Sequence, residues 1–141
     1  MQQAQFHILA DTTSLADARL ACLLATQAYR AGQTVFILAR DETQAHGLDE
    51  TLWQQDPDSF VPHALQEEAG AQQAPVEIGH QPPRRPRNLL INLQPQAPAF
   101  AGRFPQVIDF VPAEESLKQL ARERYKQYRA AGFTLEMVQP D

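Results

Sequence analysis

Residues 34–39, with the sequence TVFILA, constrain the fold most because they are apolar or β-branched at every position. A strand with one buried face alternates apolar and polar residues, whereas a strand that is covered on both faces is apolar throughout. Similar short runs rich in apolar residues lie at residues 5–10, 89–93 and 106–111. We therefore expect a central sheet that is buried on both faces.

Segments with apolar residues at helical spacing alternate with these runs, at residues 15–32, 41–53 and 115–132. Gly32 and Gly132 stand where glycine commonly ends a helix. The alternation of strands and helices predicts one α/β domain over residues 1–141. We expect a Rossmann-like three-layer arrangement, with a mostly parallel central sheet and helices on both faces.

The remaining segments carry weaker signals. Ser14 and Asp17 have the spacing of a capping box at the start of the first helix. The sequence indicates an irregular segment at residues 60–73 and short strands at residues 75–79 and 133–138. It also indicates a loop at residues 94–105 with room for a short helix. The Pro-rich, basic residues 80–88 (HQPPRRPRN) are expected to form an exposed, flexible loop within the domain.

The chain is acidic, with a formal net charge of −5. This charge argues against a protein that coats nucleic acid, so any anion site must be local. The one cysteine, Cys22, lies among leucines and alanines, which indicates a buried, inert thiol and fits a reducing compartment. The N-terminus lacks the basic and long apolar regions of a secretory signal, so we expect a cytoplasmic protein.

Motifs for catalysis, cofactor binding or metal binding are missing from the sequence. The six glycines form neither G-x-G-x-x-G nor a phosphate-binding loop. The four histidines do not pair with one another or with Cys22 at metal-ligand spacing. The three serines lie outside any G-x-S-x-G motif. We expect no enzyme activity, no cofactor and no metal.

The last predicted helix gathers five of the twelve Lys and Arg residues of the chain. At about 100° per residue, one stripe of this helix contains Lys118, Arg122, Tyr125, Lys126 and Arg129. A neighbouring stripe is expected to pack on the sheet and contains Leu117, Leu120, Ala121 and Tyr128. Arg124 falls in this apolar sector, where it either pairs with a carboxylate or reaches solvent along the edge of the core.

The cationic stripe has more than one interpretation. Lys and Arg are good helix formers, so a solvated helix face would have the same composition. The charges of the stripe are all positive, however, and Tyr125 lies among them. A guanidinium binds carboxylate or phosphate, and a neighbouring aromatic ring contacts apolar groups. The stripe therefore fits an acidic peptide with an aromatic end, or single-stranded nucleic acid.

Residues 108–133, IDFVPAEESLKQLARERYKQYRAAGF, closely resemble the C-terminal signature of the chi subunit of bacterial DNA polymerase III. Residues 48–65, LDETLWQQDPDSFVPHAL, and residues 74–78, APVEI, resemble the middle region of the same family. The resemblance covers nearly the whole chain, and it is weakest in the 80–88 loop and at the two ends.

This resemblance implies a Rossmann-like domain that has no nucleotide site and no polymerase activity of its own. It implies a non-catalytic adaptor subunit of the replicative DNA polymerase III holoenzyme, whose contact with DNA is indirect. Two protein partners follow from it. One is the psi subunit, which connects to the clamp loader. The other is the acidic C-terminal tail of single-stranded DNA-binding protein, which ends in a phenylalanine.

By position in the family, the implied tail site consists of Lys118, Arg122, Tyr125, Lys126 and Arg129, with Val111 as a wall. Arg122 is the residue expected to bind the terminal carboxylate of the tail. The implied psi-binding surface consists of Trp53, Phe60, Pro62 and His63. From composition alone, a core position for Trp53 is equally consistent.

Two other functions stay open at this point. Direct binding of single-stranded nucleic acid by the same helix would be helped by Arg84, Arg85 and Arg87, but the net charge of −5 opposes it. An enzyme that acts on a nucleotide is suggested by the fold class alone, which does not establish a function.

Overall fold

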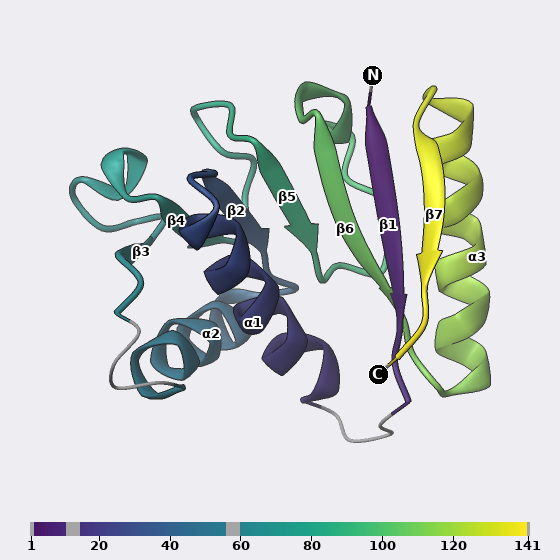
Figure 1. The fold of residues 1–141 in the computed structure, drawn as a ribbon, viewed down its shortest axis with the longest axis horizontal. Helices are drawn as coiled ribbons and strands as arrows, with labels where there is room; N and C mark the ends of the chain where they lie inside the picture. The colour runs from purple at the N-terminus through teal and green to yellow at the C-terminus, as the bar shows by residue number, and fades with distance from the viewer. Residues whose placement is uncertain (1, 11–14, 56–59, 141) are drawn as a thin grey trace.

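The computed structural model describes residues 2–10, 15–55 and 60–140, which form a seven-stranded sheet with helices on both faces (Figure 1). The strands are β1 (Gln3–Ile8), β2 (Val35–Leu38), β3 (His63–Leu65), β4 (Val76–Gly79), β5 (Leu89–Asn92), β6 (Gln106–Val111) and β7 (Thr134–Val138). Their order across the sheet is β3-β4-β2-β5-β6-β1-β7, and the paired strands are all parallel. The predicted fold class is confirmed.

The helices of the described residues lie in two layers around the sheet. They are α1 (Ala16–Arg30), α2 (Glu42–Gln54) and α3 (Glu115–Ala130), together with the short 3-10 helices η1 (Ala71–Gln73) and η2 (Ala101–Arg103). One apolar cluster contains side chains of α1 and α2, and a second cluster contains Tyr128 of α3. No helix in the described ranges is both long and apolar enough to cross a membrane.

Strand β2 shows why the sheet is buried on both faces. Val35 and Ile37 belong to the cluster that contains α1 and α2, whereas Phe36 and Leu38 belong to the cluster that contains α3. Successive side chains of a strand point to opposite faces, so a strand in the middle layer needs apolar residues at every position. This confirms the prediction from the apolar run at residues 34–39.

The ends of α1 and α3 and the start of α2 follow the signals in the sequence. Gly32 and Gly132 have φ angles of 82° and 97°, in the left-handed region that glycine adopts without strain after a helix. The side chain of Asp41 accepts a hydrogen bond from the backbone N–H of Gln44 and caps α2. The capping box predicted from Ser14 and Asp17 is wrong, because Leu15 is the N-cap residue of α1 and makes no side-chain capping hydrogen bond. Asp17 lies in the first turn of α1, and Ser14 lies outside the described residues.

The 60–73 segment differs from its predicted irregular form because it contains β3 and η1. β3 pairs with β4 at one edge of the sheet, over three residues. A strand of three residues is too short for an alternating pattern to be recognised in the sequence. The short helix predicted within residues 94–105 and the strand predicted within 133–138 are confirmed as η2 and β7.

The predicted exposure of the 80–88 loop is wrong at Arg87, which is buried against Glu77 of β4. Its Nε donates to Glu77 Oε1 at 3.1 Å. Its two terminal nitrogens donate to the backbone carbonyls of Ala71, Gln72, Ala74 and Pro75. Burial raises the pKa of Glu77 and lowers that of Arg87, and their mutual attraction opposes both shifts. A buried carboxylate needs such a partner, so Arg87 serves the fold.

The thiol of Cys22 is fully buried on α1, and burial raises its pKa to about 12. The thiolate is the reactive form of cysteine, so the native protein should resist thiol reagents. We predict that an aromatic disulfide reagent labels Cys22 no faster than the protein unfolds, and that one thiol per chain reacts at once in denaturant. Complete labelling of the folded protein within seconds would contradict the buried position.

Candidate functional site

Helix α3 rests on the sheet through Ala121, Arg124 and Tyr128, which are buried. The expected burial of Leu117 and Leu120 is wrong, since they are 40% and 38% exposed. They border a cavity of about 600 Å³ at the C-terminal ends of β5 and β6, so the strands do not cover them. The predicted core stripe is therefore correct for the middle and the end of the helix and wrong for its first two turns.

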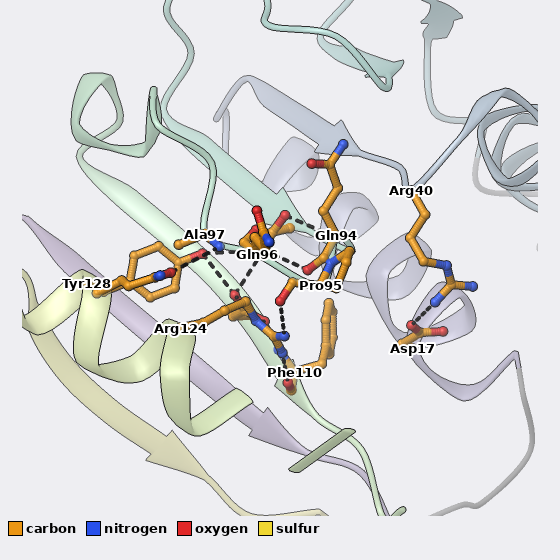
Figure 2. Close-up of polar contacts among 12 residues, drawn as sticks. Asp17, Arg40, Gln94, Pro95, Gln96, Ala97, Phe110, Arg124 and Tyr128 are labelled. Atoms are coloured by element: carbon orange, nitrogen blue, oxygen red, sulfur yellow. Dashed lines mark hydrogen bonds and ion pairs between the residues drawn. The ribbon is translucent and has the colours of Figure 1, made fainter. Parts of the chain in front are cut away.

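Arg124 joins α3 to β6 through a buried ion pair with Asp109. Figure 2 shows Arg124 beside Pro95 and Phe110, to which it also binds. Its Nε lies 3.0 Å and 3.1 Å from the two carboxylate oxygens of Asp109. Its terminal nitrogens donate to the carbonyls of Pro95 at 3.0 Å and Phe110 at 2.9 Å. Of the two positions expected from the sequence, the structure has the one in which Arg124 pairs with a carboxylate.

Further donors surround Asp109. The Tyr128 hydroxyl donates to Asp109 Oδ2 at 2.8 Å, and the Asn92 side-chain amide donates to the same oxygen at 3.1 Å. Burial raises the pKa of Asp109, but the Arg124 charge and these hydrogen bonds favour its ionised form. Burial, followed by the Asp109 charge, raises the pKa of Tyr128, which therefore stays a neutral donor. Each of the three nitrogens of Arg124 therefore has a hydrogen-bond partner within the fold.

The five residues of the predicted cationic stripe lie on α3, and together with Val111 of β6 we call them the α3 surface. This surface consists of Val111, Lys118, Arg122, Tyr125, Lys126 and Arg129. Tyr125 is half-buried and packs on Phe6 of β1, with ring centroids 5.6 Å apart. Val111, at the end of β6, packs against the same apolar cluster as Tyr125. Helical spacing places the five α3 residues on one face, and Tyr125 and Val111 give the surface a partly apolar base.

The charges of the α3 surface are held loosely. Arg122 donates to Gln119 at 3.1 Å and lies 3.7 Å from Glu115, with 58% of its side chain exposed. Lys126 lies 3.6 Å from Glu123. Within the described ranges, the side chains of Lys118 and Arg129 have no ion-pair partner. Exposed pairs of this kind contribute little to stability, so the cations stay available to an anionic partner.

Met137 of β7 is a neighbour of this surface that sequence reasoning missed. It is in register with Phe6 of β1, so both side chains lie on the face of the sheet that α3 covers. Met137 is 45% exposed. Its position depends on the pairing of β7 with β1, which are more than 100 residues apart in sequence. No local pattern in the sequence indicates that pairing.

A second surface joins the end of α2 to β3, and we call it the aromatic surface. It consists of Trp53, Phe60, Pro62 and His63. The rings of Trp53 and Phe60 lie 5.2 Å apart and are 56% and 60% exposed. Trp53 is therefore a surface residue, and the core position that composition equally allowed is excluded. Exposed aromatic side chains in contact with each other are common anchors of protein interfaces.

His63 is the buried member of the aromatic surface. Its side chain is 1% exposed, and its ring meets Trp53 edge-on at 5.0 Å. Nδ1 lies 2.6 Å from the Val61 carbonyl, and Nε2 lies 3.2 Å from both the carbonyl and a carboxylate oxygen of Asp49. Burial raises the pKa of Asp49, and His63 opposes that shift. The ring is thus fixed by α2 and by the chain that enters β3.

The two surfaces lie at opposite ends of the sheet (Figure 1). The aromatic surface borders the edge strand β3, and the α3 surface borders the edge strand β7. Five strands separate these edges in the order of the sheet. One partner on each surface would therefore meet little steric conflict.

A family model described as "DNA polymerase III chi subunit, HolC" matches residues 1–136. Proteins named DNA polymerase III subunit chi are similar over nearly their whole length. The one from Haemophilus influenzae is 47% identical and aligns over 94% of this chain and 93% of its own. The one from Escherichia coli is 46% identical, over 96% of both chains, and the one from Pseudomonas aeruginosa is 36% identical, over 96% and 95%.

A solved structure of Saccharomyces cerevisiae dbp5, bound to nup159, gle1, ip6 and adp, has a similar fold. The TM-score is 0.66 and the identity 12%, and the match covers 99% of this chain and 42% of the dbp5 chain. At this identity the similarity concerns the fold alone.

We predict that Arg124→Ala destabilises the protein by about 3–5 kcal/mol, because it leaves the Asp109 carboxylate buried without its charged partner. The matched control on the same helix is Arg129→Ala, which removes an exposed arginine and should change the free energy of unfolding by less than about 0.5 kcal/mol. Urea denaturation of both variants measures the difference. Equal stabilities would contradict a structural role for Arg124.

Proposed function

The chain belongs to the chi-subunit family of DNA polymerase III, and from this premise we propose that it is a non-catalytic adaptor with two protein-binding surfaces. The α3 surface binds the acidic C-terminal tail of single-stranded DNA-binding protein. The aromatic surface binds the psi subunit, which connects the chain to the clamp loader. The observation that supports this division most directly is the separation of the two surfaces at opposite edges of one rigid sheet.

The chemistry of the α3 surface supports an acidic peptide as its partner. Arg122 presents an exposed guanidinium, whose planar fork matches a terminal carboxylate. Tyr125 and Val111 provide the apolar base on which a terminal phenylalanine ring packs. Lys118, Lys126 and Arg129 attract the aspartates of the tail. The apolar residues of the site pack on the core, while its cations remain in water. The site therefore binds both the terminal phenylalanine and the acidic residues of such a peptide.

We predict that Arg122→Ala weakens the binding of an acidic peptide with a free C-terminal phenylalanine by about tenfold, which corresponds to about 1.4 kcal/mol. Calorimetry at low and at moderate salt measures it, and the wild-type affinity should fall as salt rises because exposed charges are screened. Arg103→Ala is the control, since Arg103 is an exposed arginine on η2 outside the surface. The same peptide with an amidated C-terminus tests whether Arg122 binds the carboxylate.

An unchanged affinity of Arg122→Ala would remove the basis for this site. An equal loss for Arg103→Ala would indicate attraction by general charge. If the amidated peptide binds the wild-type chain as tightly as the free acid, the terminal carboxylate is not a recognised group.

The aromatic surface supports a partner that buries apolar side chains. Trp53 and Phe60 expose contacting rings, and Pro62 lies beside them. Because His63 and Asp49 fix the surroundings of Trp53, the surface is pre-organised and loses little conformational entropy on binding. Pre-organised aromatic anchors commonly contribute most of the binding energy of an interface.

We predict that Trp53→Ala weakens the complex with psi by at least about tenfold and leaves the binding of the acidic peptide unchanged. Leu23→Ala is the control, because Leu23 is an apolar residue of α1 that is 50% exposed outside the surface. Co-purification with psi, followed by a binding titration, measures the effect. A wild-type affinity of Trp53→Ala for psi would contradict the assignment.

Direct binding of single-stranded nucleic acid is the alternative function of the same helix. The structure weakens this alternative at one residue, since Arg87 is buried against Glu77 and contributes no free charge. Arg84 and Arg85 of the same loop remain exposed. A gel-shift assay with bare single strands separates the two functions. Tight binding without any tail protein would favour the alternative.

A further inference from the structure

Three side chains with metal-binding chemistry meet on the surface between α2 and the turn after β3. Glu42 and His46 are one helical turn apart on α2, and Glu67 belongs to the turn that follows β3. His46 Nε2 lies 3.7 Å from a carboxylate oxygen of Glu42 and 3.6 Å from one of Glu67. One ligand atom from each residue lies within 4.8 Å of the other two. All three side chains are more than half exposed, so a hydrated ion reaches them without any opening of the fold.

We propose that Glu42, His46 and Glu67 form a surface site for one divalent transition-metal ion, such as Zn²⁺. In a tetrahedral zinc site with ligand bonds of about 2.1 Å, the ligand atoms lie about 3.4 Å from one another. The two distances from His46 exceed this value by only a few tenths of an ångström. The two carboxylates repel each other when no ion is between them, and a bound cation draws them together. Water molecules complete the coordination.

The backbone around the site is fixed before any metal binds. The hydrogen bond from Gln44 N–H to Asp41 caps α2 just before Glu42. In the turn, Glu68 accepts a hydrogen bond from the Leu65 N–H at 2.7 Å, and this bond holds the neighbouring Glu67 in place. Only side-chain rotation remains for the three ligands to close on an ion. The entropy cost of ordering exposed side chains still keeps the expected affinity moderate.

The choice of metal follows from the ligand set. Imidazole suits Zn²⁺, Ni²⁺, Co²⁺ and Cu²⁺, whereas Mg²⁺ and Ca²⁺ prefer sites made of oxygen atoms alone. Two carboxylates and one neutral imidazole also balance the charge of a divalent ion. Mg²⁺ is therefore expected to compete poorly for this site.

The site adds a connection between two elements that the fold already joins through the contact of His63 with Asp49. An ion would bridge α2 to the turn after β3, and these same elements carry the aromatic surface. A metal ion that binds the folded chain, and not the unfolded chain, stabilises the folded state. The sequence prediction of no metal site considered only pairs of histidine and cysteine. Glu67 is 21 residues beyond His46, so its position close to His46 depends on the path of the chain through β3.

The experiment uses the full chain without a histidine tag and titrates it with ZnCl₂ by calorimetry, in the presence and absence of excess Mg²⁺. We expect one ion per chain at this site. His46→Ala and Glu67→Gln, on two different elements, should each weaken zinc binding at least tenfold. His80→Ala is the control, because it removes a histidine that belongs to no three-ligand group of the described residues. Zinc should also raise the melting temperature of the wild type more than that of His46→Ala.

Three results would overturn the proposal. The first is that the wild type binds zinc no more tightly than His46→Ala does. The second is that His80→Ala loses as much zinc affinity as His46→Ala. The third is that millimolar Mg²⁺ displaces the bound zinc. The first of these would show that His46 is not a zinc ligand. Because the three ligands are exposed, the variants should have the same melting temperature as the wild type when no metal is present. If His46→Ala is nevertheless less stable, Glu67→Gln tests the site in its place.

Discussion

Arg124 and Asp109 form the buried ion pair on which the position of α3 depends. Arg124 binds the carboxylate of Asp109 and two backbone carbonyls, and Tyr128, one turn further along α3, donates to the same carboxylate. A buried charge without its partner costs several kcal/mol, so the helix has one favourable placement on the sheet. That placement turns Tyr125 toward Phe6 and leaves Arg122 in solvent. The buried ion pair thus determines how the exposed cations of the α3 surface are oriented.

The doubly covered sheet sets the distance between the two surfaces. Strand β2 in its middle is apolar on both faces, and the two surfaces lie beside its edge strands, β3 and β7. In the proposed function, the aromatic surface beside β3 binds psi and the α3 surface beside β7 binds the acidic tail. The separation also explains how an acidic protein offers an anion site. The cations concentrate on one helix face, while the rest of the chain keeps the net charge at −5.

Local patterns in the sequence predicted the fold because each middle strand and each helix carries its own signal. The continuous apolar run of β2, the acids at the start of α2 and the glycines after α1 and α3 are examples. The sequence did not predict β3, the burial of Arg87 or the exposure of Leu117, because each depends on contacts with distant segments. The grouping of the five α3 residues followed from helical spacing, whereas the packing of Tyr125 on Phe6, from the other end of the chain, did not.

The assignment of the acidic tail to α3 is tested most directly by nuclear magnetic resonance. Amide signals of the isotope-labelled chain would be followed while an acidic peptide with a free C-terminal phenylalanine is added. The largest shifts should fall in α3, at the end of β6 and in β7, and the signals of α2 and β3 should stay unchanged. Shifts confined to the surroundings of Trp53 and Phe60, with none in α3, would contradict the proposed division of the two surfaces.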